Sequence, residues 1–242
     1  MKKKLLFLLF LVLVLLIILT RSNMVSANEI YNGDYWDNYR LGDVFYRKLD
    51  EPHYNDPDYY DYIGYHKTEY PGSIANEYIN KNNSTNPENK NYKLMSEIIE
   101  SRIVDKNTYP DTLFLHIRVG DVFCDKTEWL NKINGPEIYS KAGDKEWWSE
   151  IVYYIEENNI NKVIIISGSH KNMCLDESLK YLEDRKQFLI SKIPGLTVEY
   201  RLGDSPDQNI LLVYHVKHFK TTGGEYGRLL TDINKIGKNN LK

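Results

Sequence analysis

The 242-residue sequence has few cysteines, no excess of basic over acidic residues and no residue spacing typical of a metal site. Its two cysteines exclude a disulfide-dense miniprotein. No Cys-x-x-Cys motif or histidine pair has the spacing of a zinc site, so we expect no metal cofactor. Lysine and arginine total 31 against 34 acidic residues, and this lack of a cationic excess argues against nonspecific nucleic-acid binding.

The remaining composition is that of a folded protein. Aromatic residues make up 13% of the chain and charged residues 27%, which excludes an intrinsically disordered protein. The length suits one compact domain of ordinary size with a small appendage. We therefore divide the chain into a targeting segment at 1–27, an irregular region at 28–110 and a regular domain at 111–242.

The first 27 residues are predicted to direct the chain to a membrane. Three lysines at 2–4 precede an unbroken apolar run over Leu5–Leu19. This pattern favours a retained signal anchor with a cytosolic N-terminus, as in a single-pass type II membrane protein. The sequence Val-Ser-Ala at 25–27 leaves cleavage after Ala27, followed by secretion, as the alternative. Either outcome puts residues 28–242 in the secretory pathway or on a cell or virion surface.

Residues 28–110 show little regular pattern before a helix near their end. Residues 28–70 contain ten of the 20 tyrosines, and Gly, Pro and Asp interrupt any helical period. We interpret them as irregular structure packed by its aromatic rings. A sugar-acceptor surface is the alternative, because tyrosine combines a flat apolar face with a polar tip. Asn82 and Asn83 begin two overlapping N-glycosylation sequons, and an apolar helical stripe follows from Leu94 to Ile103.

From about residue 111, apolar strands alternate with amphipathic helices. Strands are predicted at 112–118, 162–167, 197–201 and 218–221, and helices near 147–155, 177–192, 205–217 and 228–233. This alternation is typical of a parallel sheet covered by helices on both faces, and it predicts an α/β, Rossmann-like fold. The ligand crevice of such a sheet lies beyond the carboxyl ends of its strands.

Polar residues end the first predicted strand at that edge. His116 and Arg118 alternate along the strand, so their side chains point to the same face. The five-donor fork of Arg118 suits a diphosphate, Gly120 permits a sharp turn, and Asp121 can orient Arg118. A structural ion pair between Arg118 and Asp121 beside a buried His116 is the alternative interpretation.

The later strands also end in polar turns. Ser167 begins a small turn after the second strand. Asp204 and Asp207 lie at the start of a helix, where Ser205 and Gln208 fit a capping box. The fourth strand leads into a hydroxyl and glycine loop that can form an anion-binding nest, made of Thr221, Thr222, Gly223 and Gly224. An ordinary helix start or glycine-rich turn explains each of these features equally well when it is taken alone.

The sequence HIRVGD at 116–121 resembles the H-x-R-x-G-D motif of the fucosyltransferase superfamily, which includes the α-1,2, α-1,6 and protein O-fucosyltransferases. The order of the later sequences IIISGSH, SPDQNILLVYHVKHF and TTGGEYG is similar to that of the α-1,2 type. The resemblance covers about residues 110–235. It implies the GDP-sugar-binding half of a GT-B-like fold, without an essential metal, and a glycan or protein acceptor.

The resemblance also implies a role for each matching residue. Arg118 would hold the β-phosphate and stabilise the leaving GDP. The sequence shows no obvious catalytic base, and Asp121 and Glu225 are the candidates. His116 would lie near the nucleoside. Asp207, or otherwise Asp204, would contact the base or ribose. The remaining donor-binding candidates are Gly120, Ser167, Thr221, Thr222, Gly223 and Gly224.

Two departures from the family pattern keep other functions open. Val119 stands where many relatives have a second arginine, and Glu225 adds an acid near the predicted diphosphate. They motivate the alternative of a non-catalytic relative that acts as a membrane-tethered binding or surface protein. A structural secreted protein that assembles through its tyrosine-rich arm is a third hypothesis.

The two cysteines follow consecutive predicted strands. If those strands are neighbours, the loops that carry Cys124 and Cys174 lie side by side. We therefore predict a disulfide between them, because the compartment is expected to be oxidising. Two free buried thiols are the alternative.

Overall fold

A single parallel sheet forms the centre of the protein. The computed structural model describes residues 35–36, 39, 41–46, 70–82, 90–104, 106–120, 123, 143–168 and 174–240. The sheet lies in this part of the chain and contains β1 (Thr112–His116), β2 (Lys162–Ile166), β3 (Thr197–Arg201) and β4 (His218–Thr221), in the order β3-β2-β1-β4. The predicted α/β, Rossmann-like fold is thus confirmed. Strands β3 and β4 have their predicted bounds, whereas β1 ends at His116 and β2 at Ile166, two residues and one residue before their predicted ends, so Arg118 follows β1 instead of lying on it.

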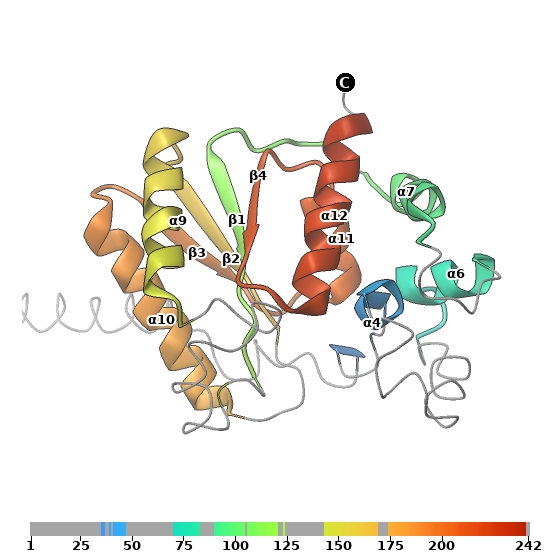
Figure 1. Ribbon diagram of the computed structural model, residues 1–242, viewed down its shortest axis with the longest axis horizontal. Helices are drawn as coiled ribbons and strands as arrows, with labels where there is room; N and C mark the ends of the chain where they lie inside the picture. The colour runs from blue at the N-terminus through green and yellow to red at the C-terminus, as the bar shows by residue number, and fades with distance from the viewer. Residues whose placement is uncertain are drawn as a thin grey trace, which may run out of the picture.

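The central strands β1 and β2 are almost continuously apolar, as expected for strands with helices on both faces, whereas the edge strands β3 (TVEYR) and β4 (HFKT) carry several polar residues. On one face, Leu113 and Leu115 pack with α9 (Lys145–Glu157) and α10 (Leu175–Lys192). On the other face, Phe114 and Phe219 pack with α11 (Pro206–Val213) and α12 (Gly224–Asn240). Figure 1 shows α9 and α10 on one side of the strands and α11 and α12 on the other.

Three helices from the first half of the chain extend the α12 side of the molecule. They are α4 (Leu41–Tyr46), α6 (Ile74–Lys81) and α7 (Tyr92–Glu100) (Figure 1). Their buried residues, such as Phe45 and Tyr78, belong to the same core as Phe114. The regions predicted as separate at 28–110 and 111–242 therefore share one hydrophobic core across the described residues.

Helix α4 lies inside the stretch that we predicted to be irregular. It packs against the start of α12 so closely that a Cβ atom on Gly42 would lie 3.1 Å from the backbone nitrogen of Tyr226. Leu41 and Phe45 are 0% and 1% exposed. The aromatic packing predicted for residues 28–70 is therefore present in their described part, but a short helix carries it.

The two ends of α11 have different origins. Its start follows the predicted capping box, in which Ser205 Oγ accepts from the Gln208 backbone and the Gln208 side chain accepts from the Ser205 backbone. Its end comes at Val213, four residues before the predicted one. The amide of Asn234 donates to the carbonyl oxygens of Val213 (2.7 Å) and Val216 (2.8 Å), so a side chain from α12 caps the early end.

Residues 1–27, which we predicted to be a signal anchor or signal peptide, lie outside the described residues. In the part of the chain that the structure describes, no helix combines the length and the apolar character needed to cross a bilayer.

Candidate functional site

The strand order places a topological switch point between β1 and β4. The chain runs from β1 through β2 to β3 on one side and then returns to add β4 on the other side of β1. All pairs are parallel, and His116 lies opposite both Ile166 and Thr221 in the register. The strand ends therefore share one edge, and open α/β sheets bind ligands at such a switch point.

His116 and Thr221 connect the two strands at this edge. Nδ1 of His116 lies 3.0 Å from Oγ1 of Thr221, and the backbone N–H of Gly223 donates to the same oxygen at 3.1 Å. His116 is 5% exposed. Burial, with a smaller contribution from the Arg118 charge, lowers the pKa of His116 to about 4, so the ring is neutral at pH 7.

Arg118 lies against the turn that follows β4. Its backbone N–H donates to Oγ1 of Thr222 at 3.0 Å, and the backbone N–H of Thr222 donates to the carbonyl of His116 at 3.0 Å. The side chain of Arg118 packs over Gly224, since a Cβ atom there would lie 3.1 Å from its Cδ and 3.4 Å from its Nη1. Sequence elements about 100 residues apart thus meet at one point.

The turn itself requires glycine. Gly223 and Gly224 have φ angles of 113° and 78°, in the region that side chains avoid. Helix α12 begins at Gly224, so its N-terminus lies beside the Arg118 side chain. A guanidinium and a helix N-terminus both carry positive charge, and together they favour a bound anion such as a phosphate. Glu225 belongs to the same first helical turn, and its charge opposes such an anion.

Gly227 is a part of this arrangement that the sequence analysis missed. A Cβ atom on Gly227 would lie 2.3 Å from Oγ1 of Thr221 and 3.2 Å from Nδ1 of His116. The spacing of Gly224 and Gly227 is the signal that could have identified it, because residues three apart share one face of a helix. Two glycines on that face let α12 begin directly against the ends of β1 and β4.

Gly120 and Ser167 support the edge from inside the protein. The N–H of Gly120 donates to Oγ of Ser178 at 3.0 Å. Ser167 is 0% exposed, and its hydroxyl donates to the carbonyl of Ile117 at 2.7 Å. The bonds of these two donor-binding candidates hold β1 and β2 to each other and to α10.

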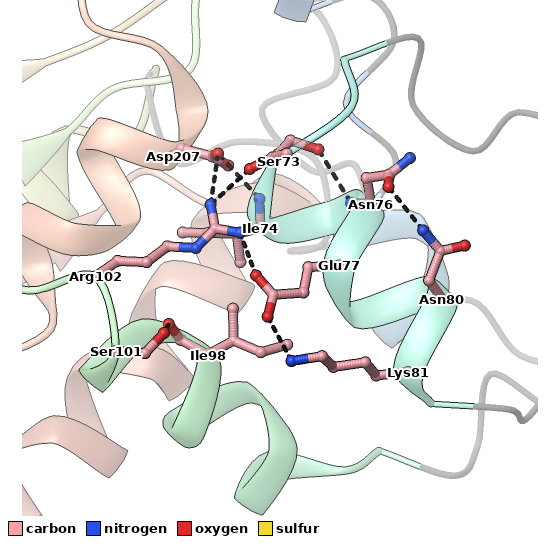
Figure 2. A network of polar contacts seen from close by, with 11 residues as sticks. Ser73, Ile74, Asn76, Glu77, Asn80, Lys81, Ile98, Ser101, Arg102 and Asp207 are labelled. Carbon is pink, nitrogen blue, oxygen red and sulfur yellow. Dashed lines mark hydrogen bonds and ion pairs between the residues drawn. The ribbon is translucent and has the colours of Figure 1, made fainter.

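Asp204 and Asp207 are not gathered around Arg118. Asp204 forms an ion pair with Arg201. Oδ2 of Asp207 accepts the backbone N–H of Ile74 at 3.0 Å and lies 3.7 Å from Nη1 of Arg102. Figure 2 shows these contacts between α11 and the start of α6. Burial raises the pKa of Asp207.

The other predicted residues lie partly outside the described chain. Asp121, Cys124 and Asn83 are among those outside. Asn82 forms the C-cap of α6, where its N–H donates to the carbonyl of Tyr78 at 2.8 Å. Cys174 is disulfide-bonded, and its pairing with Cys124 stays a prediction. Within the described residues, no three His, Cys, Asp or Glu side chains are grouped so that they could hold a metal ion.

Comparison of the chain with protein-family models, with curated proteins and with solved structures finds no match. The resemblance to fucosyltransferases therefore depends on the short motifs alone. The geometry at the switch point is independent of that resemblance.

Proposed function

We propose that this protein is a glycosyltransferase of the fucosyltransferase type, tethered by its N-terminal segment. It transfers a sugar from a GDP-sugar to a glycan or protein acceptor in the secretory lumen. The observation that carries the proposal is the packing of the Arg118 side chain against the N-terminus of α12 at the β1/β4 switch point. The proposal that the donor carries guanine and fucose depends on the H-x-R-x-G-D motif and on the order of the motifs that follow it.

The chemistry of transfer fits a cation at this position. The bond between sugar C1 and the β-phosphate oxygen breaks while the acceptor oxygen bonds to C1, so negative charge grows on the departing GDP. Arg118 and the N–H groups of α12 stabilise that charge, which lowers the barrier. His116 is neutral at pH 7, which leaves Arg118 as the cation at the end of β1. The acceptor proton passes to a base, for which Asp121 and Glu225 are the candidates.

A non-catalytic binding protein is the second candidate, and Val119 favours it. Val119 is 1% exposed and belongs to the core beneath α9 and α10. The position where relatives carry a second arginine therefore contributes packing in this protein. With one arginine and an opposing Glu225, the site would bind a nucleotide sugar without driving its cleavage.

One assay separates the two candidates. Purified full-length protein is incubated with GDP-fucose labelled in the sugar, with and without a panel of glycan and peptide acceptors, and released GDP and labelled product are measured. A transferase releases GDP, and Arg118→Ala abolishes the release while the matched variant Arg228→Ala, at an exposed arginine of the same helix α12, does not. GDP binding, measured on the same protein by titration calorimetry, without release assigns the binding function. Absence of both binding and release refutes the proposal.

A further inference from the structure

Aromatic and polar side chains form a second feature of the carboxyl edge, beside the Arg118 turn. We call it the Tyr226 cluster, and its members are Trp36, Tyr39, Asp207, Asn209 and Tyr226. The Tyr226 ring centroid lies 5.2 Å from that of Trp36, 5.7 Å from that of Tyr39 and 5.6 Å from that of His116, each at a steep angle. The cluster therefore touches the end of β1 through His116.

Trp36 extends the cluster over the end of β2. A Cβ atom on Gly168 would lie 2.4 Å from Cε2 of the indole, so the ring rests directly on that backbone. Trp36 is 8% exposed, which places it just below the surface. Strand β2 is the neighbour of β1, and the N–H of Ile117 donates to the carbonyl of Ile166 at 3.0 Å. The indole and the Arg118 side chain thus occupy the ends of adjacent strands.

The cluster contains an unusual number of buried polar atoms without a hydrogen-bond partner. Within the described residues, the atoms without a hydrogen bond of good geometry are Nε1 of Trp36, the hydroxyl oxygen of Tyr39, Oδ1 of Asp207 and both amide atoms of Asn209. Asp207 lies beside Tyr39, and Asn209 beside Tyr226, close enough for weak interactions that do not replace full hydrogen bonds. Asn209 is 0% exposed. Unpaired buried polar atoms are rare in proteins because each loses its bonds to water. Their concentration in one place indicates a polar ligand, or bound water, that completes them.

The unpaired atoms include both donors and acceptors. The indole N–H and the Asn209 amide nitrogen donate, whereas the Asp207 carboxylate oxygen accepts. A hydroxyl group does both and satisfies either kind of partner. At neutral pH a phosphate group is negatively charged and supplies hydrogen-bond acceptors without donors. A carboxylate such as that of Asp207 repels it, so this cluster is unsuited to the anion that the Arg118 turn favours.

We infer that the Tyr226 cluster binds the sugar ring of the nucleotide sugar, an inference that rests on the proposed function. The aromatic faces cover the C–H surface of the ring, and the unpaired atoms bond its hydroxyl groups. The phosphates lie at the Arg118 turn and the sugar extends from there toward Trp36. Trp36 and Tyr39, from the tyrosine-rich region, are then part of the donor site.

The test compares the affinities of GDP, GDP-fucose and GDP-mannose for the full-length protein by titration calorimetry. Trp36→Phe retains an aromatic ring and removes the indole N–H, and Asn209→Leu removes the amide at similar volume. Trp147→Phe is the matched control, because Trp147 is 7% exposed and lies in the core on the α9 side. We expect the wild type to bind one GDP-sugar roughly tenfold more tightly than GDP, as one or two hydrogen bonds provide. That gain is lost in Trp36→Phe and Asn209→Leu and retained in Trp147→Phe.

The outcomes distinguish failure of this inference from failure of the proposed function. If the wild type binds GDP and both GDP-sugars equally, or if both variants retain the gain, the sugar subsite is refuted while the GDP site stands, and the unpaired atoms are assigned to bound water. If the wild type does not bind GDP, the proposed function fails and this inference fails with it. Near-ultraviolet circular dichroism identifies a variant that does not fold, and the other variant then decides.

Discussion

His116 Nδ1 and Thr221 Oγ1 lie 3.0 Å apart, and this hydrogen bond joins the carboxyl ends of β1 and β4. Thr221 also accepts the N–H of Gly223, the first glycine of the turn against which Arg118 packs. This pair, of which His116 is buried, therefore sets the position of the turn that forms the candidate anion site.

Stability at acidic pH should depend on His116. Its pKa is lowered from 6.5 to about 4, chiefly by burial, so the folded protein favours the neutral ring. Above about pH 6.5 the ring of His116 is neutral in both the folded and the unfolded chain, and protonation costs no stability. As the pH falls toward 4, the ring takes up a proton in the unfolded chain but not in the folded one, so the free energy of unfolding falls. Since one pKa unit corresponds to about 1.4 kcal/mol, the loss between about pH 7 and about pH 4.5 is roughly 2 kcal/mol.

Urea unfolding of the wild type and of His116→Gln at both pH values measures this effect. The free energy of unfolding of the wild type, relative to the variant, should fall by roughly 2 kcal/mol at the lower pH. The variant serves as the control for all other titrating groups, which are common to both proteins. A difference that stays constant with pH would show that the ring is not held neutral by burial.

Gly227→Ala should weaken both folding and ligand binding. The added methyl would lie 2.3 Å from Thr221 Oγ1, so α12 must shift away from β4. We expect a destabilisation of about 1–3 kcal/mol, although alanine is the better helix former. Gly143→Ala is the control, because its Cβ meets no atom within 4 Å. Equal urea midpoints for the two variants would contradict the close approach of α12 to the His116–Thr221 pair.

Arg102 should stabilise the junction of α6, α7 and α11. It forms an ion pair with Glu77, donates to the carbonyl of Gly72 at 2.8 Å and lies 3.7 Å from Asp207, while it is 26% exposed (Figure 2). Arg102→Ala should cost about 2 kcal/mol in the free energy of unfolding, because it also leaves Asp207 half-buried without its cation.

Lys106→Ala provides the comparison for Arg102. Lys106 is 60% exposed and pairs with Glu100 at 3.0 Å, so its removal should cost less than about 1 kcal/mol. Chemical denaturation of both variants at neutral pH measures the difference. If Arg102→Ala lowers the free energy of unfolding no more than Lys106→Ala does, the network in Figure 2 contributes no more to stability than an exposed surface ion pair.

The fold could be predicted from local patterns because the two central strands are short apolar runs and helical patterns alternate with all four strands. The sequence TLFLH is buried along its whole length, as a central parallel strand requires. The helix ends were harder to predict where distant residues determine them. Asn234 ends α11 at Val213 from another helix, and only the spatial arrangement reveals that contact.

The site residues that directly follow a strand could be predicted from the sequence. Those whose position depends on contacts with distant parts of the chain could not. Arg118 and the Gly223–Gly224 turn were named from strand ends, and the structure brings them together. Asp207 occupies the expected helix start, but its contacts are with Ile74 and Arg102 from the first half of the chain. Trp36 belongs to a tyrosine-rich stretch without periodicity, so no pattern in the sequence indicates that it covers Gly168.

The affinity of the full-length protein for GDP, with and without the Arg118 guanidinium, tests the central claim most directly. Titration calorimetry should give saturable GDP binding by the wild type and by Arg228→Ala. The affinity should fall roughly 10- to 100-fold in Arg118→Ala, as expected for the loss of charged hydrogen bonds to phosphate. No binding by the wild type, or equal affinities for Arg118→Ala and Arg228→Ala, would contradict a phosphate site at the β1/β4 switch point.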